Sequence, residues 1–260
     1  WASRPRRLPS PTAEPTPTEA TARAILPANN PGGYFLAPLV GSEIESWTRL
    51  NGPGETMAKL YFRYGTVGSA KTLNLLAVAH NYERQGKGVV VMKPSADTRF
   101  GASRVASRAG LEREADLLLE DETELPEELF DSCHCVLVDE AQFVSAFVID
   151  QLRQLTLARN IPVICYGLRN DFRTHLFAGS KRLLELADSI EEIKTTCAYC
   201  NRKAVFNLKS VDGKPTLDGP SRTLGCEELY LPVCHAHYIE KLELTAAELQ
   251  DLLAEPEETL

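Results

Sequence analysis

The sequence has no run of about 18 consecutive apolar residues, which is the least that a membrane-spanning helix requires. It also has no apolar core of about 7–15 residues after its early arginines, so the pattern of a secretory signal peptide is missing. An excess of positive charge is absent too, because 28 Lys and Arg face 36 Asp and Glu, for a formal net charge of −8. This balance argues against a general binder of nucleic acid or of anionic membranes.

The cysteine content is well below that of a disulfide scaffold. There are seven cysteines in 260 residues, and a C-x-x-C spacing occurs at Cys197 and Cys200. This usage is more typical of metal ligands and buried thiols in a reducing compartment than of disulfides, so we expect a cytoplasmic protein.

The first 56 residues lack the periodic apolar pattern of a helix or a strand and hold 9 of the 16 prolines. We predict a disordered or non-native N-terminal extension over 1–56, with Met57 as a candidate true start. A genuine regulatory extension is the alternative.

A phosphate-binding pattern follows. An aromatic-rich strand pattern at 60–64 leads into GTVGSAKT and then into a helical pattern, which is the layout of a P-loop. Lys71 is placed to reach the β- and γ-phosphates of ATP, and the Thr72 hydroxyl is placed to bind Mg²⁺. The strict pattern has glycine before the lysine, whereas this chain has Ala70, and alanine tolerates a positive φ poorly. The predicted phosphate-binding residues are Gly65, Thr66, Val67, Gly68, Ser69, Ala70, Lys71 and Thr72, and an ordinary glycine turn is the alternative.

The chain from 57 to 192 alternates apolar strands with helices, which predicts an α/β fold: a P-loop parallel sheet with helices on both faces. The acidic stretch 112–131 is predicted to be surface. The expected strands are 60–64, 89–92, 135–138 and 161–165, and the expected helices are 72–85, 145–159 and about 180–187.

Charged residues follow two of these strands at their carboxyl ends, where open α/β sheets bind ligands. Asp97 and Arg99 come just after the strand at 89–92. Asp139 and Glu140 end the strand at 135–138 in a Walker-B-like arrangement, in which the first acid helps to hold Mg²⁺. The second acid is placed to take a proton from a substrate hydroxyl or to orient a water. A solvated loop and an ordinary strand end are the alternatives.

Two metal-ligand patterns, CAYC at 197–200 and CHAH at 234–237, are separated by 33 residues. Three thiolates and one imidazole fill a tetrahedral shell, which favours a structural Zn²⁺ over a redox C-x-x-C pair. Glycines and prolines between the patterns predict a long loop rather than a domain core, with the metal anchoring its base. A capping box at Thr245 and Glu248 predicts a C-terminal helix and tail within 242–260. The predicted metal ligands are Cys197, Cys200, Cys234 and His237.

The segments YFRYGTVGSAKT, KPSADTRF, VDEAQF and CAYC…GCEELYLPVCHAHY resemble, in order and spacing, the zinc-containing type II thymidine kinases. The resemblance covers about 57–240 and makes 193–241 a zinc-anchored lasso subdomain. It implies that Glu140 is the general base, that Asp139 is the Walker-B acid, and that Asp97 and Arg99 lie beside the phosphates. It also implies a thymidine pocket made by Val67, Phe143, Leu168, Phe172 and the lasso residue Tyr230.

The activity that this resemblance implies is transfer of the ATP γ-phosphoryl group to the 5′-hydroxyl of thymidine, which gives dTMP for nucleoside salvage and DNA synthesis. We therefore expect thymidine and ATP as substrates, Mg²⁺ and structural Zn²⁺ as cofactors, and a homo-oligomer, either dimer or tetramer. No nucleic acid or membrane is expected as a partner. The chain departs from the family at Ala70 and at Cys226, where glycine is usual.

Two other functions stay open. A nucleic-acid-binding ATPase with a zinc ribbon would need a basic stripe around the cysteines, but the lysines and arginines there are interleaved with acidic residues. A zinc-stabilised interaction module with an inactive P-loop is supported by Ala70 alone.

Overall fold

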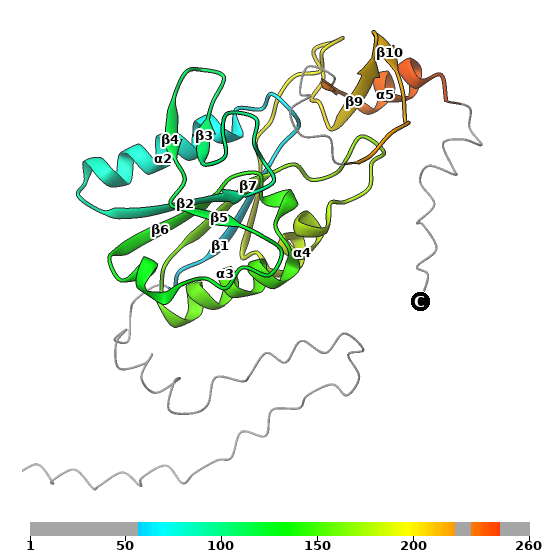
Figure 1. The fold of residues 1–260 in the computed structure, drawn as a ribbon. Coiled ribbons are helices and arrows are strands. Elements are labelled where there is room, and N and C mark those ends of the chain that lie inside the picture. The colour runs from blue at the N-terminus through cyan, green and yellow to red at the C-terminus, as the bar shows by residue number, and fades with distance from the viewer. Residues whose placement is uncertain (1–56, 222–229, 245–260) are drawn as a thin grey trace, which may run out of the picture. The chain divides into compact units, whose positions relative to one another are not determined.

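The computed structural model describes residues 57–221 and 230–244 (Figure 1). The predictions for 1–56, for Cys226 and for the helix beginning at Thr245 lie outside these residues. Among the helices of the described ranges, none combines the length and the apolar character needed to cross a membrane.

A six-stranded sheet with parallel pairing throughout forms the larger layer, in the order β5-β2-β6-β7-β1-β8. The four predicted strands are confirmed, and the sheet gains a further strand at each edge. Its strands are β1 (Leu60–Tyr64), β2 (Gly88–Pro94), β5 (Leu117–Leu119), β6 (Cys133–Val138), β7 (Val163–Gly167) and β8 (Ser189–Glu192).

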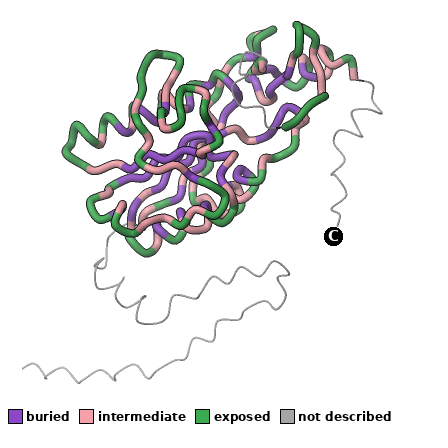
Figure 2. Tube along the Cα trace, in the orientation of Figure 1, coloured by how far each residue is buried: buried purple, intermediate pink, exposed green. Residues whose placement is uncertain are grey.

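Helices cover both faces of this sheet, as predicted (Figure 1). Successive strand residues point to opposite faces. Val90 and Met92 therefore pack with Leu152 of α3, whereas Val91 packs with Leu75 of α2. Figure 2 shows that the buried positions concentrate along the strands between these helices. The helices are α2 (Lys71–Arg84), α3 (Ala146–Ala158) and α4 (Ala178–Leu186).

The acidic stretch 112–131 is not all surface, which corrects the prediction. It contributes β4 (Glu112–Glu114), which pairs with β3 (Arg104–Ala106) as a hairpin, and the edge strand β5. The 3₁₀ helix η1 (Glu127–Phe130) then buries Phe130 in the core. Three leucines suffice for β5 because it is an edge strand that pairs with β2 alone. The acidic residues on either side make so short an apolar run difficult to recognise in the sequence.

The segment between the two metal-ligand patterns is a small sheet with its own core, so the prediction of a long loop is wrong there. Strands β9 (Phe206–Val211), β10 (Lys214–Pro215) and β11 (Tyr230–Val233) pair in the antiparallel order β10-β9-β11. Helix α5 (His235–Leu242) follows directly. We call residues 193–244 the zinc-site subdomain; its described core is Cys197, Leu208, Val233, Cys234 and Tyr238.

Candidate active site

The P-loop joins β1 to α2, and its lysine is the first residue of that helix. The Lys71 ammonium donates to the carbonyl oxygens of Thr66 at 2.8 Å and Gly65 at 3.2 Å. Gly68 has φ +74° and Ala70 has φ +63°, both in the left-handed region. The loop therefore keeps its turn despite the alanine, at a cost of about 1 kcal/mol for a residue with a Cβ.

A hydroxyl and a carboxylate meet beside this loop. Thr72 Oγ1 donates to Asp139 Oδ2 at 3.0 Å, and Asp139 directly follows β6. Burial, together with the negative charge of Glu140, raises the pKa of Asp139 to about 7. Two hard oxygen donors facing one cleft suit Mg²⁺, which favours carboxylate and hydroxyl oxygens together with phosphate. The residues present thus fit the predicted cation.

A chain of charges crosses the carboxyl edge of the sheet from β2 to β6. Buried Lys93 lies 3.2 Å from Asp97 Oδ2, and Asp97 Oδ1 accepts from Arg99 Nε at 2.7 Å. Arg99 in turn pairs with Glu140. Burial alone would raise the pKa of Asp97, but Arg99 and then Lys93 hold it below its usual value. Burial alone would lower the pKa of Arg99, but the charges of Glu140 and Asp97 raise it instead.

Glu140 also faces the opposite way, toward the 3₁₀ helix η2 (Ala141–Phe143). Its Oε2 accepts from Gln142 Nε2 at 2.6 Å, and Gln142 Oε1 accepts the Leu168 N–H at 2.9 Å. The glutamine fits because Gly167 precedes Leu168, and a Cβ at that glycine would lie 2.7 Å from Gln142 Oε1. Glu140 has φ +49°, a strained backbone that the surrounding contacts hold.

Apolar and aromatic side chains line the other half of the cleft. Phe143 and Phe177 meet edge to face, with ring centroids 5.4 Å apart, and Phe172 lies 6.1 Å from the Tyr230 ring. The whole cleft has a volume of about 270 Å³. The predicted site residues that line it are Val67, Gly68, Ser69, Ala70, Lys71, Thr72, Asp97, Arg99, Asp139, Glu140, Phe143, Leu168, Phe172 and Tyr230.

Two predicted phosphate residues, Gly65 and Thr66, do not line this cleft and border a small second cavity instead. The cleft also has walls that the sequence analysis did not identify. Gln142 lay within the VDEAQF segment and could have been found there, but the β3–β4 hairpin and Asn207 carry no motif. The additional lining residues include Arg104–Ala109, Gln142, Asn170, Asp171, Phe177, Asn207 and Ser221.

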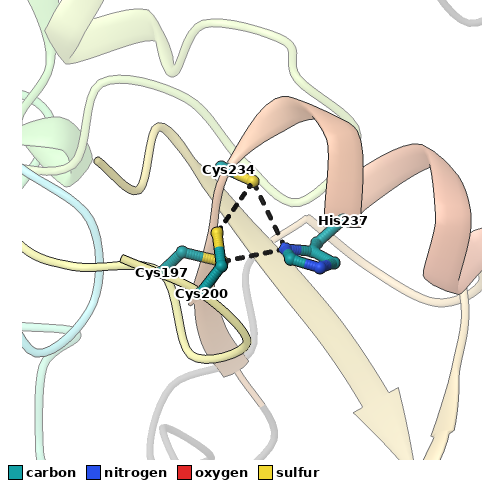
Figure 3. Close-up of side chains that lie close together, drawn as sticks. All are labelled: Cys197, Cys200, Cys234 and His237. Atoms are coloured by element: carbon teal, nitrogen blue, oxygen red, sulfur yellow. Dashed lines mark hydrogen bonds between the residues drawn. The ribbon is translucent and has the colours of Figure 1, made fainter. Parts of the chain in front are cut away.

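The four predicted metal ligands come together in the zinc-site subdomain (Figure 3). His237 Nδ1 lies 3.4 Å from the sulfurs of Cys197 and Cys234, and Cys200 Sγ lies 3.8 Å from Cys234 Sγ. A tetrahedron with Zn–S bonds of about 2.3 Å has edges of about 3.8 Å, so these separations fit a tetrahedral Zn²⁺.

The surroundings of the thiols favour the ligand form. Burial alone would raise the pKa of the Cys197 thiol, but the N–H groups of Cys234 and Tyr199, with His237, lower it to about 6. A thiolate is the form that binds metal. The sulfur and nitrogen donor set thus fits the zinc that the sequence predicts.

Comparison with known proteins places this chain among relatives that it matches over most of its length. A family model described as Thymidine kinase matches residues 58–238. The chain is 48% identical over 187 residues to a thymidine kinase of Streptococcus gordonii, a match that covers 71% of this chain and 97% of that protein. It is 47% identical over 190 residues to a thymidine kinase of Lactococcus lactis, with 71% and 98% covered.

Proposed function

The chain belongs to the thymidine kinase family, and we propose that it transfers the γ-phosphoryl group of ATP to the 5′-hydroxyl of thymidine. The products are dTMP and ADP. This agrees with the activity that the sequence motifs implied, and the nucleic-acid-binding ATPase is not favoured.

The position of Glu140 is the observation that carries the proposal. One carboxylate oxygen pairs with Arg99 on the phosphate side of the cleft. The other accepts from Gln142, which also holds the Leu168 N–H at the apolar side. A carboxylate held between a phosphate site and a pocket lined by aromatic rings is placed to meet the nucleoside hydroxyl.

We assign the reaction to groups in this cleft as follows. The thymidine 5′-oxygen attacks the γ-phosphorus, a new O–P bond forms, and the bond to the β–γ bridging oxygen breaks as ADP leaves. Glu140 accepts the hydroxyl proton, while Lys71 and Arg99 balance the charge on the phosphoryl oxygens. Positioning and charge neutralisation suffice, because phosphoryl transfer needs little covalent help from the protein.

The two metals have separate places in this proposal. Thr72 and Asp139 would hold Mg²⁺, which supplies positive charge at the phosphates when bound. The ligands Cys197, Cys200, Cys234 and His237 would hold a structural Zn²⁺ with no position open for substrate. The zinc then stabilises the sheet that carries Tyr230, whose ring packs near Phe172 in the predicted thymidine pocket.

The remaining parts of the proposal concern assembly and location. A homo-oligomer, either dimer or tetramer, stays a prediction from the family resemblance, and a cytoplasmic location stays a prediction from the cysteine usage. Light scattering on the purified protein would measure the mass in solution.

A nucleoside panel tests the function. The full chain is incubated with ATP, Mg²⁺ and, separately, thymidine, deoxyuridine, deoxycytidine and deoxyadenosine, and the products are identified by mass spectrometry. We expect dTMP and an equal amount of ADP. ATP hydrolysis that needs DNA or RNA, with no nucleoside monophosphate, would overturn the proposal in favour of the ATPase.

A further inference from the structure

We propose that Asn207 couples the zinc-site subdomain to the P-loop, so that the state of the metal site sets how firmly the loop is held for ATP. Asn207 is then a positioning residue, since it acts on the phosphate site through the backbone of Val67. The part of the proposal that concerns ATP rests on the proposed function, whereas the mechanical coupling does not.

Asn207 lies on the central strand of the small sheet, on the face away from the metal-site core. Leu208 points into that core and is fully buried. Its neighbours Asn207 and Lys209 point to the opposite face, because side chains alternate along a strand. Asn207 is nevertheless only 4% exposed and lines the ATP cleft, so the strand presents a buried carboxamide to the P-loop.

The carboxamide holds one particular peptide of the P-loop. Asn207 Oδ1 accepts the Val67 N–H at 2.8 Å, across 140 residues of sequence. The carbonyl of Thr66, in the same peptide unit, accepts from Lys71 Nζ at 2.8 Å and from the Ser69 N–H at 3.2 Å. A peptide unit is planar, so these partners fix its orientation from opposite sides.

Asn207 becomes more important when nucleotide binds. In the proposed reaction the Lys71 ammonium serves the phosphates, which compete with the Thr66 carbonyl for the same group. The hydrogen bond from the Val67 N–H to Asn207 Oδ1 then remains, and it holds this peptide from outside the loop. The turn that faces the phosphates depends on the left-handed backbones of Gly68 and Ala70, which follow this peptide in the chain. A change in the orientation of the 66–67 peptide would therefore change that turn.

The other end of the connection reaches the metal ligands. Pro232 of β11 lies opposite Asn207 in the sheet register, and its carbonyl accepts the Ala198 N–H at 2.8 Å. Ala198 lies between the ligands Cys197 and Cys200. The next residue of β11, Val233, accepts the Val205 N–H at 2.9 Å and directly precedes the ligand Cys234. The segment with Cys197 and Cys200 is therefore bonded to Pro232, the residue of β11 that faces Asn207. The ligand Cys234 lies two residues after Pro232 in the chain.

Hydrogen exchange in the absence of nucleotide tests the coupling directly. In the unmodified chain we expect the Val67 amide to be protected. Asn207→Ala should speed its exchange about 5–30-fold, as loss of one buried hydrogen bond implies. Asn207→Asp keeps an acceptor oxygen and should restore protection, and Ser210→Ala, on the same strand, should leave Val67 unchanged.

A double-mutant cycle then asks whether the metal site acts through this bond. Cys200→Ser should speed Val67 exchange and weaken binding of a non-hydrolysable ATP analogue with Mg²⁺ several-fold. In the Asn207→Ala background the same change should add little. If Cys200→Ser does not fold, His237→Gln takes its place.

Additive effects of the two substitutions, or unchanged Val67 exchange in a folded metal-site variant, would overturn the coupling. The proposed function fails in a different way. An unmodified chain that binds no ATP analogue would contradict the kinase proposal, while the exchange of Val67 in the nucleotide-free protein would still decide the coupling.

Discussion

The parallel-sheet domain (57–192) and the zinc-site subdomain differ in the size of their cores and in the groups that these cores surround. The parallel sheet has a core on both faces, and its carboxyl edge carries the charged chain from Lys93 to Glu140. It also holds Ala70 and Glu140 in left-handed conformations. The zinc-site subdomain has a much smaller core, built around two of the metal ligands themselves.

The difference in core size affects stability. A large core stabilises enough to hold closely paired charges at a functional edge. A small core contributes less stability, and metals commonly supply the missing stabilisation in such domains. We infer that the parallel sheet carries the chemistry, whereas the zinc-site subdomain shapes the substrate pocket. Substitutions in the first should therefore lower kcat, and substitutions in the second should raise KM.

The largest effect should come from Glu140→Gln, because an amide cannot accept the hydroxyl proton. We expect kcat to fall about 10²–10⁴-fold while affinity for the ATP analogue stays within a few-fold. Steady-state kinetics and calorimetry measure both quantities. Glu185→Gln, at an exposed position on α4, is the matched control and should change neither. A Glu140→Gln variant with more than about a tenth of the activity would assign the base to another group.

Arg99→Met should have the next largest effect. It removes the charge that pairs with Asp97 and Glu140, and in the proposed reaction it also removes a donor to the phosphoryl oxygens. We expect kcat to fall about 10²-fold, as for loss of a single charge-stabilising donor. Arg182→Met, which removes the two ion pairs of this α4 residue with Asp150 and Glu185, should leave kcat unchanged. A rise in thymidine KM at constant kcat would place Arg99 in the nucleoside pocket instead.

Cys200→Ser addresses the zinc-site subdomain and should affect binding more than chemistry. Losing one of four ligands weakens the metal site and the sheet that carries Tyr230, so we expect thymidine KM to rise about 10-fold and the melting temperature to fall. The kcat should change only a few-fold. Cys133→Ser, at a half-buried thiol outside the metal site, is the control. A metal-free preparation with unchanged thymidine KM would show that the subdomain does not shape the pocket.

The smallest effect should come from Ala70→Gly, which relieves a left-handed alanine. Relief of about 1 kcal/mol is partly offset by the greater entropy of glycine in the unfolded chain, so stability should rise only slightly. Ala77→Gly, at an exposed position inside α2, should instead lower the free energy of unfolding by about 1 kcal/mol. Chemical denaturation compares the two, and equal losses would show that Ala70 is not strained.

The sequence predicted the parallel sheet well because its strands are continuous apolar runs that end in recognisable motifs. The edge strand β5 was missed since three leucines between acids give no clear period. Strand β9 was missed for another reason. Its buried face includes Asn207 and Lys209, and polar residues in a strand are usually read as exposed.

The candidate site likewise contains residues that the sequence could predict and residues that it could not. Residues within motifs, such as Lys71, Asp139 and Glu140, could be assigned roles from spacing, and the structure places them around one cleft. Asn207 could not be found, because its contact with Val67 joins segments 140 residues apart. The β3–β4 hairpin, which carries the lining residues Arg104–Ala109, depends on strand pairing that a single sequence does not show.

Product identification tests the central claim, that the parallel-sheet edge activates a 5′-hydroxyl presented by the pocket. The full chain is incubated with ATP and Mg²⁺ and with either thymidine or 5′-deoxythymidine, and the products are assigned by mass spectrometry and phosphorus NMR. We predict thymidine 5′-monophosphate from the first nucleoside and no nucleotide from the second. Phosphorylation of 5′-deoxythymidine, or of the 3′-hydroxyl of thymidine, would contradict the account.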